Sequence, residues 1–412
     1  MTSQSVSGGE GRGVDEHFDV IVIGAGPAGS ASAGLLAQAG HRVLVLEKDA
    51  FPRFHIGESL LPAGLSVLRR LGVDERDAVF LYKRGAEFVC EDSGRSRVFA
   101  FDESLPSEDR HAWHVERARF DTLLRDAAVR HGADVRHGET VRDAGVDDDL
   151  AWVETRTARF TARYLVDASG QSRLLARRNG SAVPYDCFGN SAVFTHFTDL
   201  GDAAVGELEP HNDIRVVLRP EGWGWVIPLS GRRLSVGLVS SGKVDSAELE
   251  SFVSGPLVTR LTAGATRGET RVIGNYSYRN ERPAGRRFAA VGDAACFLDP
   301  VFSSGVTLAL RGAESLADTL APALADGREA DPDLLADHLA SMDRAFRTFA
   351  ALIGRFYNRS FAERLFLGDV DGMPMKSGVI SALAGDVWRT GNEFQDMLLR
   401  ARRSPVRRQQ VG

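Results

Sequence analysis

A glycine-rich turn between two short apolar runs constrains this chain more than any other feature of its sequence. Phe18 to Ile23 (FDVIVI) has the continuous apolar character of a fully buried parallel strand, and Arg42 to Leu46 (RVLVL) predicts a second strand. Between them lie the turn Gly24 to Gly29 and a small-residue helix, Ser30 to Ala39, which Gly40 closes. This βαβ unit predicts an α/β fold built on a doubly wound parallel sheet.

The turn has the glycine spacing of a dinucleotide-binding site. Gly24 allows the tight turn, Gly26 lets the backbone approach a pyrophosphate, and Gly29 permits close packing of the helix. The helix N-terminus offers free N–H groups and partial positive charge to the phosphates. Glu47 ends the second strand, where an acid can accept hydrogen bonds from ribose hydroxyls. Together these features predict a bound dinucleotide, with two further contacts at Ala28 and Lys48.

Composition narrows the class of protein. A chain of 412 residues exceeds a usual single core, so we expect a nucleotide domain that carries a substrate domain. A net charge of −6 does not favour nucleic-acid binding, which needs a basic face. The three cysteines, Cys90, Cys187 and Cys296, are far apart, which is typical of reduced thiols in a cytoplasmic protein. The ten histidines form no metal-ligand pattern, so we predict no metal.

The N-terminal region contains no predicted membrane or targeting segment. Met1 to His17 is polar and rich in glycine and serine, and we expect a disordered leader without an apolar signal region. Val20 to Gly40 carries no charge and is long enough for a membrane span. Its glycines and its proline instead indicate a strand, a turn and a packed helix, so we predict no membrane segment.

The order of the patterns along the chain predicts a discontinuous arrangement of domains. The alternation from Asn190 to Val239 is typical of the long strands of an antiparallel substrate-domain sheet. We expect residues 18–80, 105–185 and 272–330 to form the nucleotide domain. We expect residues 81–104 and 186–271 to form the substrate-domain sheet, and residues 331–412 a C-terminal helical region.

Two later segments identify the expected dinucleotide. Asp167 to Gly170 (DASG) follows a buried strand, and Gly292 and Asp293 follow the apolar run FAAV. With the glycine turn, they resemble the three nucleotide signatures of the hydroxylase-type flavoproteins, which implies an FAD-binding Rossmann-like domain. The resemblance implies that Asp293 binds the ribityl chain and that Arg117 lies beside the FAD phosphates. It also places Asp167 in the FAD site.

The most specific segment is GWGWVIP, residues 222–228. It resembles the WxWxIP signature of flavin-dependent halogenases, matching at Trp223, Trp225, Ile227 and Pro228. Two indoles on one face of a strand can wall a dry passage beside the flavin. By composition alone, a pair of strand tryptophans packed in a core is the plainer interpretation.

Three further positions carry the same resemblance. FPRFHIGESLLP, residues 51–62, is similar to the segment before the active site in halogenases of phenols and carrier-bound rings. There Gly57, Glu58 and Ser59 form a strap between the flavin and substrate compartments, and Ser59 contacts the cofactor. Lys83 falls at the position of the family's catalytic lysine, where burial would lower its pKa.

The segment DPVFSSG opens a helix after the Gly-Asp pair, and the resemblance places chloride on the amides of Ser304 and Gly305. Tryptophan halogenases carry a glutamate where this chain has Phe302. That departure favours the branch acting on phenols, pyrroles and carrier-bound rings.

The resemblance implies a reaction. A separate reductase supplies reduced FAD, oxygen converts it to a hydroperoxide, and chloride is oxidised to hypochlorous acid. The acid reaches Lys83, whose ammonium hydrogen-bonds it or whose neutral amine is chlorinated, and the substrate ring is chlorinated. Glu58 is the candidate for taking the proton from the ring.

We expect a pyrrolyl or aryl ring on a carrier protein, and next a free phenol. A basic tail could attract such a carrier through Arg400, Arg402, Arg403, Arg407 and Arg408.

Three alternatives stay open at this stage. An aromatic hydroxylase of the same fold would consume NADPH by itself and would not need Lys83. An isoprenoid-type double-bond reductase would have no use for the WxWxIP segment. A flavin-binding sensor or carrier-docking module would bind FAD without oxygen reactivity. The sequence does not decide the identity of the ring, the number and position of halogens, the halide or the oligomeric state.

Overall fold

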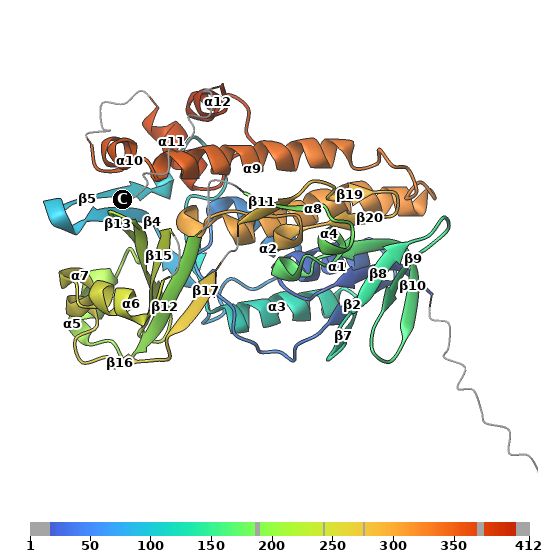
Figure 1. Cartoon of the computed structure of the whole chain (residues 1–412), viewed down its shortest axis with the longest axis horizontal. Helices are drawn as coiled ribbons and strands as arrows, with labels where there is room; N and C mark the ends of the chain where they lie inside the picture. The colour runs from blue at the N-terminus through green and yellow to red at the C-terminus, as the bar shows by residue number, and fades with distance from the viewer. Residues whose placement is uncertain (1–16, 186–189, 242–243, 275–276, 369–374, 401–412) are drawn as a thin grey trace, which may run out of the picture.

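The computed structural model describes residues 17–185, 190–241, 244–274, 277–368 and 375–400. It is a mixed α/β protein in which a mainly parallel sheet and a mainly antiparallel sheet stand beside each other under a layer of helices (Figure 1). The predicted fold class, an FAD-type Rossmann-like sheet with an antiparallel sheet and C-terminal helices, is confirmed.

The first sheet is parallel at its centre. Its strand order is β19 (Ala284–Gly285), β20 (Phe288–Ala290), β10 (Arg159–Asp167), β1 (His17–Ile23), β2 (Val43–Glu47) and β7 (Asp134–His137). From β20 to β7 every neighbouring pair is parallel. The antiparallel strands β8 (Asp143–Val146) and β9 (Ala151–Glu154) continue from β10.

Both faces of this sheet are covered, which explains its continuous apolar runs. Helices α1 (Pro27–Gln38), α3 (Arg117–Arg130) and α8 (Ser304–Ala325) pack on one face in a common hydrophobic core. Strands β8 and β9 and helix α4 (Leu174–Arg178) cover the other face. Helix α1 begins at Pro27, three residues before the predicted Ser30, because proline at the first helical position has a φ already suited to a helix.

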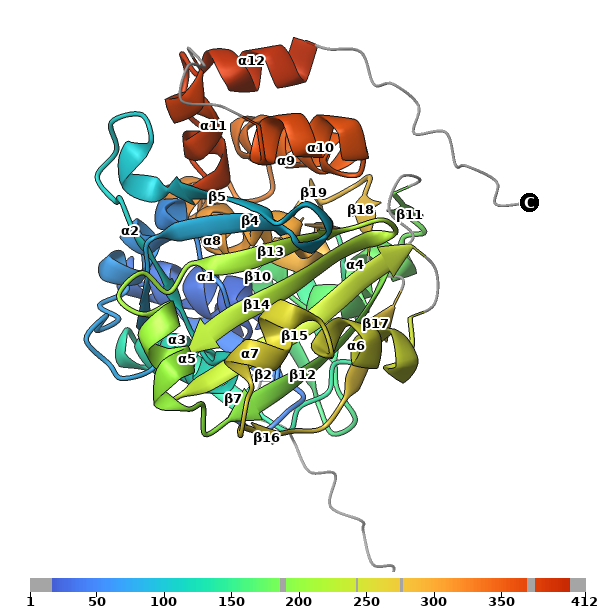
Figure 2. The same cartoon turned by 90° about the vertical axis from the view of Figure 1, so that its left-hand side faces the viewer.

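The second sheet holds the longer strands. Its order is β16 (Thr266–Arg267), β12 (Asn190–Thr198), β15 (Arg233–Ser241), β14 (Gly222–Leu229), β13 (Ile214–Arg219), β4 (Gly85–Cys90) and β5 (Arg95–Ala100), and β17 (Arg271–Gly274) also pairs with β12. Helices α5 (Asp202–Leu208), α6 (Ser246–Val253) and α7 (Pro256–Leu261) pack on one face, as Figure 2 shows. The opposite face belongs to the core that contains the C-terminal helices.

Two smaller ladders join the sheets. One contains β11 (Ala182–Pro184), β18 (Tyr278–Asn280) and β21 (Cys296–Phe297). The other pairs β3 (Leu81–Lys83) with β6 (Ala112–His114). We expected residues 81–104 to lie in the substrate-domain sheet, whereas β3 stands outside it. Arg84, which follows β3, binds Asp213 beside the second sheet, so β3 lies close to that sheet without pairing with it.

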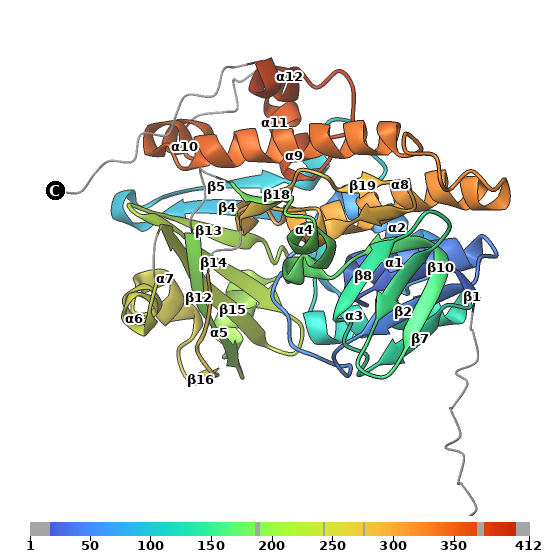
Figure 3. The same cartoon turned by 45° about the vertical axis from the view of Figure 1, so that its right-hand side comes forward.

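The remaining helices form the upper layer in Figure 3. They are α9 (Ala336–Phe356), α10 (Arg359–Phe366), α11 (Lys376–Leu383) and α12 (Glu393–Arg400), while the short α2 (Leu65–Arg70) precedes β3. Helix α9 runs above α8 and along the second sheet (Figures 1 and 3). Among the described residues, no helix combines the length and apolar character needed to cross a membrane.

Several expectations concern positions outside the described residues. The leader up to residue 16, Cys187, and the basic tail beyond Arg400 lie there. Of the other cysteines, Cys90 and Cys296 are buried free thiols. Within the described ranges, no group of three or more histidine, cysteine or acidic side chains could hold a metal ion.

Candidate active site

A cavity of about 620 Å³ lies where the parallel sheet meets the second sheet. It opens at the carboxyl ends of β1, β2 and β10, which is where ligands bind in open α/β sheets. Most of the site residues expected from sequence line it: Gly24, Gly26, Ala28, Glu47, Lys48, Glu58, Ser59, Arg117, Trp223, Trp225, Ile227, Gly292, Asp293, Ser304 and Gly305. The strap, which was expected at Gly57–Ser59, extends from Arg53 to Ser59 and forms one wall.

The glycine turn is shaped for close backbone approach. Gly24 has a φ of +95°, and a Cβ there would lie 2.6 Å from the carbonyl oxygen of Ala168. A Cβ on Gly29 would lie 1.9 Å from the carbonyl oxygen of Gly24, so Gly29 stands behind the cavity wall and supports the turn. Glu47 also supports it, because its Oε2 accepts a hydrogen bond from the amide of Ala25 at 2.7 Å.

Two guanidinium groups lie beside this turn. Arg117 donates to both carboxylate oxygens of Asp121, at 2.8 and 3.1 Å, and to the carbonyl of Ile56 in the strap. Arg53 reaches Asp121 at 3.4 Å and lies close to Gly26. Free amides of a helix N-terminus, glycines and two arginines suit the pyrophosphate of a dinucleotide. The side chains present therefore fit FAD.

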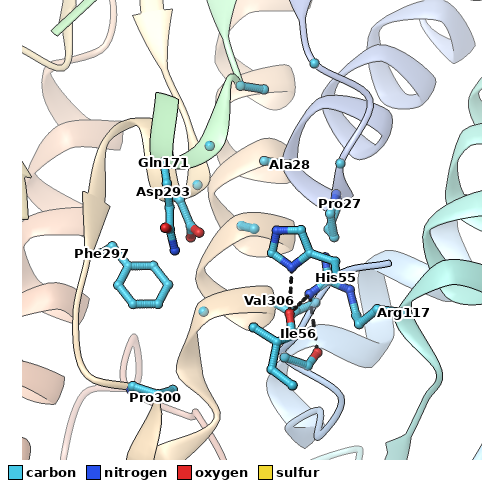
Figure 4. A pocket seen from close by; sticks show the side chains of 18 of the residues that line it. Pro27, Ala28, His55, Ile56, Arg117, Gln171, Asp293, Phe297, Pro300 and Val306 are labelled. Atoms are coloured by element: carbon cyan, nitrogen blue, oxygen red, sulfur yellow. Dashed lines mark hydrogen bonds between the residues drawn. The ribbon is translucent and has the colours of Figure 1, made fainter. Parts of the chain in front are cut away.

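Polar groups from different elements enter the middle of the cavity. Figure 4 shows the side chains of His55 and Asp293 there, with Gln171 and Phe297 beside Asp293. Burial raises the pKa of Asp293 to about 6. Burial, with the charge of Arg117, lowers the pKa of His55 to about 4, so its imidazole is neutral and its Nδ1 contacts the carbonyl of Ile56 at 2.7 Å. His55 was not among the predicted site residues, although it lies inside the segment that carries the resemblance.

Asp167 does not line the cavity. Its carboxylate is fully buried and accepts hydrogen bonds from the amides of Ser169 at 3.0 Å and Leu175 at 2.8 Å. The neighbouring residues Ala168 to Ser172 form the wall in front of it. Both of its oxygens accept from the chain's own amides, so Asp167 supports that loop from behind, and its direct contact with the cofactor stays a prediction.

Lys83 is enclosed by protein. Its side chain is 1% exposed, and its Nζ donates to Ser59 Oγ at 2.8 Å and to the carbonyl of Leu60 at 2.9 Å. The ring of Phe101 lies 5.1 Å from the amine. Burial lowers the pKa of Lys83 to about 7. Since Ser59 lines the cavity and Lys83 does not, the amine lies directly behind the strap.

The two indoles also line the cavity. Trp223, Trp225 and Ile227 alternate along β14 and line the cavity, while Pro228 is on the other face of the strand. The indole centroids are 5.8 Å apart, and Trp225 donates to Ser235 Oγ at 3.1 Å. The two indoles thus share one face of β14 and line the cavity, and their role as a wall beside the flavin stays a prediction.

A buried carboxylate connects this wall to the expected halide loop. Asp299 accepts hydrogen bonds from Trp223 Nε1 (3.2 Å), Asn190 Nδ2 (2.8 Å), the Tyr357 hydroxyl (2.6 Å) and the Val301 amide (3.1 Å). Burial raises its pKa, and these donors oppose that shift. Asp299 had no predicted role within this loop, because its side-chain partners are far away in sequence.

The amides expected to bind halide stand at the start of a long helix. Ser303 has a φ of +55°, and α8 begins at Ser304, so the amides of Ser304 and Gly305 belong to its first turn. Phe302 is buried in an aromatic cluster with Phe88, Phe356 and Phe366. That position therefore contributes packing and no carboxylate.

Replacing Asp299 by alanine is expected to lower the free energy of unfolding by about 2 kcal/mol, because the buried donors Trp223 Nε1 and Asn190 Nδ2 and the partly buried Tyr357 hydroxyl lose an acceptor. Chemical denaturation measures the change. Asp202→Ala is the matched control, since that side chain is 95% exposed and should change stability by less than about 0.5 kcal/mol. Equal stability of the two variants would contradict the role of the network.

Comparisons with known proteins agree with this site. The tryptophan halogenase family model matches residues 19–110 and 94–377. The chain is 34% identical over 334 residues to a 1H-pyrrole-2-carbonyl-[peptidyl-carrier protein] chlorinase of Pseudomonas fluorescens, covering 73% of this chain and 74% of the relative. It is 32% identical over 381 residues to the flavin-dependent halogenase armH3 of Armillaria mellea, covering 84% and 75%.

Solved structures show the same likeness. The flavin-dependent brominase Bmp2 superimposes with a TM-score of 0.80 at 27% identity, covering 93% of this chain and 97% of that one. A flavoprotein/dehydrogenase of Cytophaga hutchinsonii gives a TM-score of 0.81 at 30% identity, covering 93% and 96%.

Proposed function

Because the chain belongs to the flavin-dependent halogenase family, we propose that it chlorinates an electron-rich aromatic ring and that Lys83 delivers the halogen. The favoured substrate is a pyrrolyl or aryl group tethered to a carrier protein, and a free phenol is next. The observation that carries the proposal is Lys83, an amine buried behind the cavity wall with a pKa near 7.

FAD is the cofactor of this family, and the glycine turn, Glu47, Arg117, Gly292 and Asp293 are the residues that would hold it. When bound in its reduced form, FAD supplies the oxygen activation that converts halide to hypohalous acid. We propose that a separate reductase supplies the reduced flavin. The amides of Ser304 and Gly305 would bind the halide at the start of α8.

The indole wall and the strap would keep the oxidant away from water. Trp223, Trp225, Ile227 and Ser59 line the cavity, and Lys83 stands behind Ser59. The ammonium form of Lys83 can hydrogen-bond hypohalous acid, and the neutral amine can carry the halogen itself. A pKa near 7 makes both forms available at neutral pH. Glu58 would take the proton that the halogen replaces.

Two observations support the proposed substrate class: the substrate of one relative, and Phe302, at which this sequence departs from the tryptophan halogenases. The Pseudomonas fluorescens relative acts on a carrier-bound pyrrole, and its matched region includes most of this chain. Phe302 removes the carboxylate that tryptophan halogenases have at that position, and apolar packing surrounds it. Because a brominase is among the similar solved structures, bromide is the second halide to test.

The test is an assay with FAD, a flavin reductase, NADH and oxygen, in chloride or bromide, with a pyrrolyl group on a carrier protein or with phenol. We expect a halide-dependent mass increase in the product. An aromatic hydroxylase would instead insert oxygen in the absence of halide. A product that gains oxygen and no halogen in every halide would overturn the proposal in favour of hydroxylation.

A further inference from the structure

One carboxylate oxygen at the cavity wall has no hydrogen-bond partner in the part of the chain that the structure describes. Glu58 is 3% exposed, and its Oε1 accepts a hydrogen bond from His196 Nε2 at 2.7 Å. Its Oε2 is buried and forms no hydrogen bond with any described residue. A buried acceptor left unpaired is destabilising, so the fold retains this oxygen at an energetic disadvantage. Since Glu58 lines the cavity, the missing partner is a group bound in that cavity.

The backbone around Glu58 is fixed. The carbonyl of Glu58 accepts a hydrogen bond from the Val115 amide at 2.8 Å, and the Leu60 amide donates to the Trp113 carbonyl at 2.9 Å. Ser59 between them also forms a β-bridge with His114. Because the backbone is held on both sides, the position of the carboxylate depends on its side-chain torsions and therefore on His196.

His196 is itself held in one orientation. It lies on β12, and its ring packs edge-on against Phe54 at 5.9 Å and Phe194 at 6.3 Å, which both line the cavity. Its side chain is 25% exposed, so it connects the buried carboxylate with solvent. Glu116, whose charge interacts with His196, forms an ion pair with Arg233, and the Arg271 guanidinium lies over the Phe54 ring at 3.6 Å.

We infer that His196 is a positioning residue for halogenation: it holds Oε1 of Glu58 so that Oε2 receives the proton displaced from the ring. This inference rests on the proposed function. The carbon–halogen bond forms as the halogen–oxygen bond of hypohalous acid breaks, and the leaving hydroxide takes a proton from the Lys83 ammonium to give water. The ring carbon then loses its proton to Glu58, and the electrons of that C–H bond restore the aromatic system.

The arrangement links both reacting groups through neighbouring residues. Ser59 accepts the hydrogen bond of Lys83, and the preceding residue, Glu58, is the proposed proton acceptor. The strap therefore sets the distance between Lys83, the proposed halogen donor, and Glu58, the proposed proton acceptor. His196 completes it, because without its donor Glu58 can rotate away from the ring.

The experiment compares His196→Phe, which keeps an aromatic ring between Phe54 and Phe194, with His196→Gln, which keeps an N–H donor. The ring that the wild type halogenates is prepared with hydrogen or deuterium at the reacting carbon. We expect His196→Phe to slow halogenation about tenfold and to show a primary isotope effect that the wild type lacks, because proton loss becomes limiting. His196→Gln should restore both the rate and the absence of an isotope effect.

Glu58→Gln should slow halogenation by about 100-fold with the same isotope effect, and adding His196→Phe to it should cause no further loss. His41→Phe is the matched control, a partly buried histidine whose Nε2 contacts the Ala321 carbonyl at 2.9 Å away from the cavity. FAD titration of every variant checks that the fold is intact. Slower halogenation by His196→Phe without an isotope effect, or no slowing, would overturn the inference while leaving the halogenase proposal standing. No halogenated product from the wild type would overturn both.

Discussion

Replacing Lys83 by methionine is expected to reduce halogenation by about 10³-fold, while reduced FAD is still reoxidised by oxygen. Methionine fills the buried space, but it offers neither an ammonium nor an amine to the oxidant. Product mass spectrometry measures halogenation, and the absorbance of flavin measures its reoxidation. Lys376→Met is the control, because that lysine is in a partly exposed ion pair with Glu103 outside the cavity.

The pH dependence of the wild type adds a second readout of the same residue. With a pKa near 7, Lys83 changes from ammonium to amine as the pH rises through neutrality. Because the ammonium form protonates the leaving hydroxide in the proposed reaction, we expect the rate to fall as the pH rises through neutrality, and a rate that rises would identify the amine as the active form. The inflection should keep its position when bromide replaces chloride, because it belongs to the protein. An inflection that moves with the halide would belong to the hypohalous acid and would contradict the assignment.

Gly29→Ala is expected to weaken FAD binding by at least about 100-fold, or by roughly 2.7 kcal/mol. The new methyl group would lie 1.9 Å from the carbonyl oxygen of Gly24, so helix α1 or the turn must move. Either movement displaces the helix N-terminus that we expect to face the pyrophosphate. Titration of the apoprotein with FAD, followed by flavin fluorescence, measures the loss.

The matched control is Gly206→Ala in helix α5. A Cβ at Gly206 meets no atom within 4 Å, and alanine favours helix by up to about 1 kcal/mol relative to glycine. This variant should bind FAD as the wild type does and unfold at the same or a higher temperature. Unchanged FAD affinity in Gly29→Ala would show that the turn is not the pyrophosphate site.

Local patterns explain why so much of the nucleotide half could be predicted from sequence. The first strand, the glycine turn and Glu47 all lie within residues 18–47, where spacing alone places them at one edge of a sheet. The alternation of Trp223, Trp225 and Ile227 likewise fixes a common strand face. The position of Lys83 came from family resemblance, and its burial could be expected only through that resemblance.

Long-range pairs explain what sequence could not supply. His196 is 138 residues from Glu58, and Asn190 is 109 residues from Asp299, so no local pattern brings either pair together. The same applies to β3, whose pairing with β6 depends on where the strap and Arg84 hold the chain. Asp167 illustrates a different limit of sequence-based prediction. Its motif was recognised, but the motif does not show which backbone amides donate to its carboxylate oxygens.

The hydroxyl of Tyr357, immediately after α9, has a consequence for engineering. It reaches Asp299 in the loop before α8, so the C-terminal helices are attached by a hydrogen bond to the loop that we expect to carry halide. A chimera that took the C-terminal helices and Tyr357 from another halogenase would replace this hydrogen bond along with the outer surface of the protein. Recombination boundaries intended to alter substrate range are therefore best drawn after residue 357, which keeps the tyrosine with its own carboxylate.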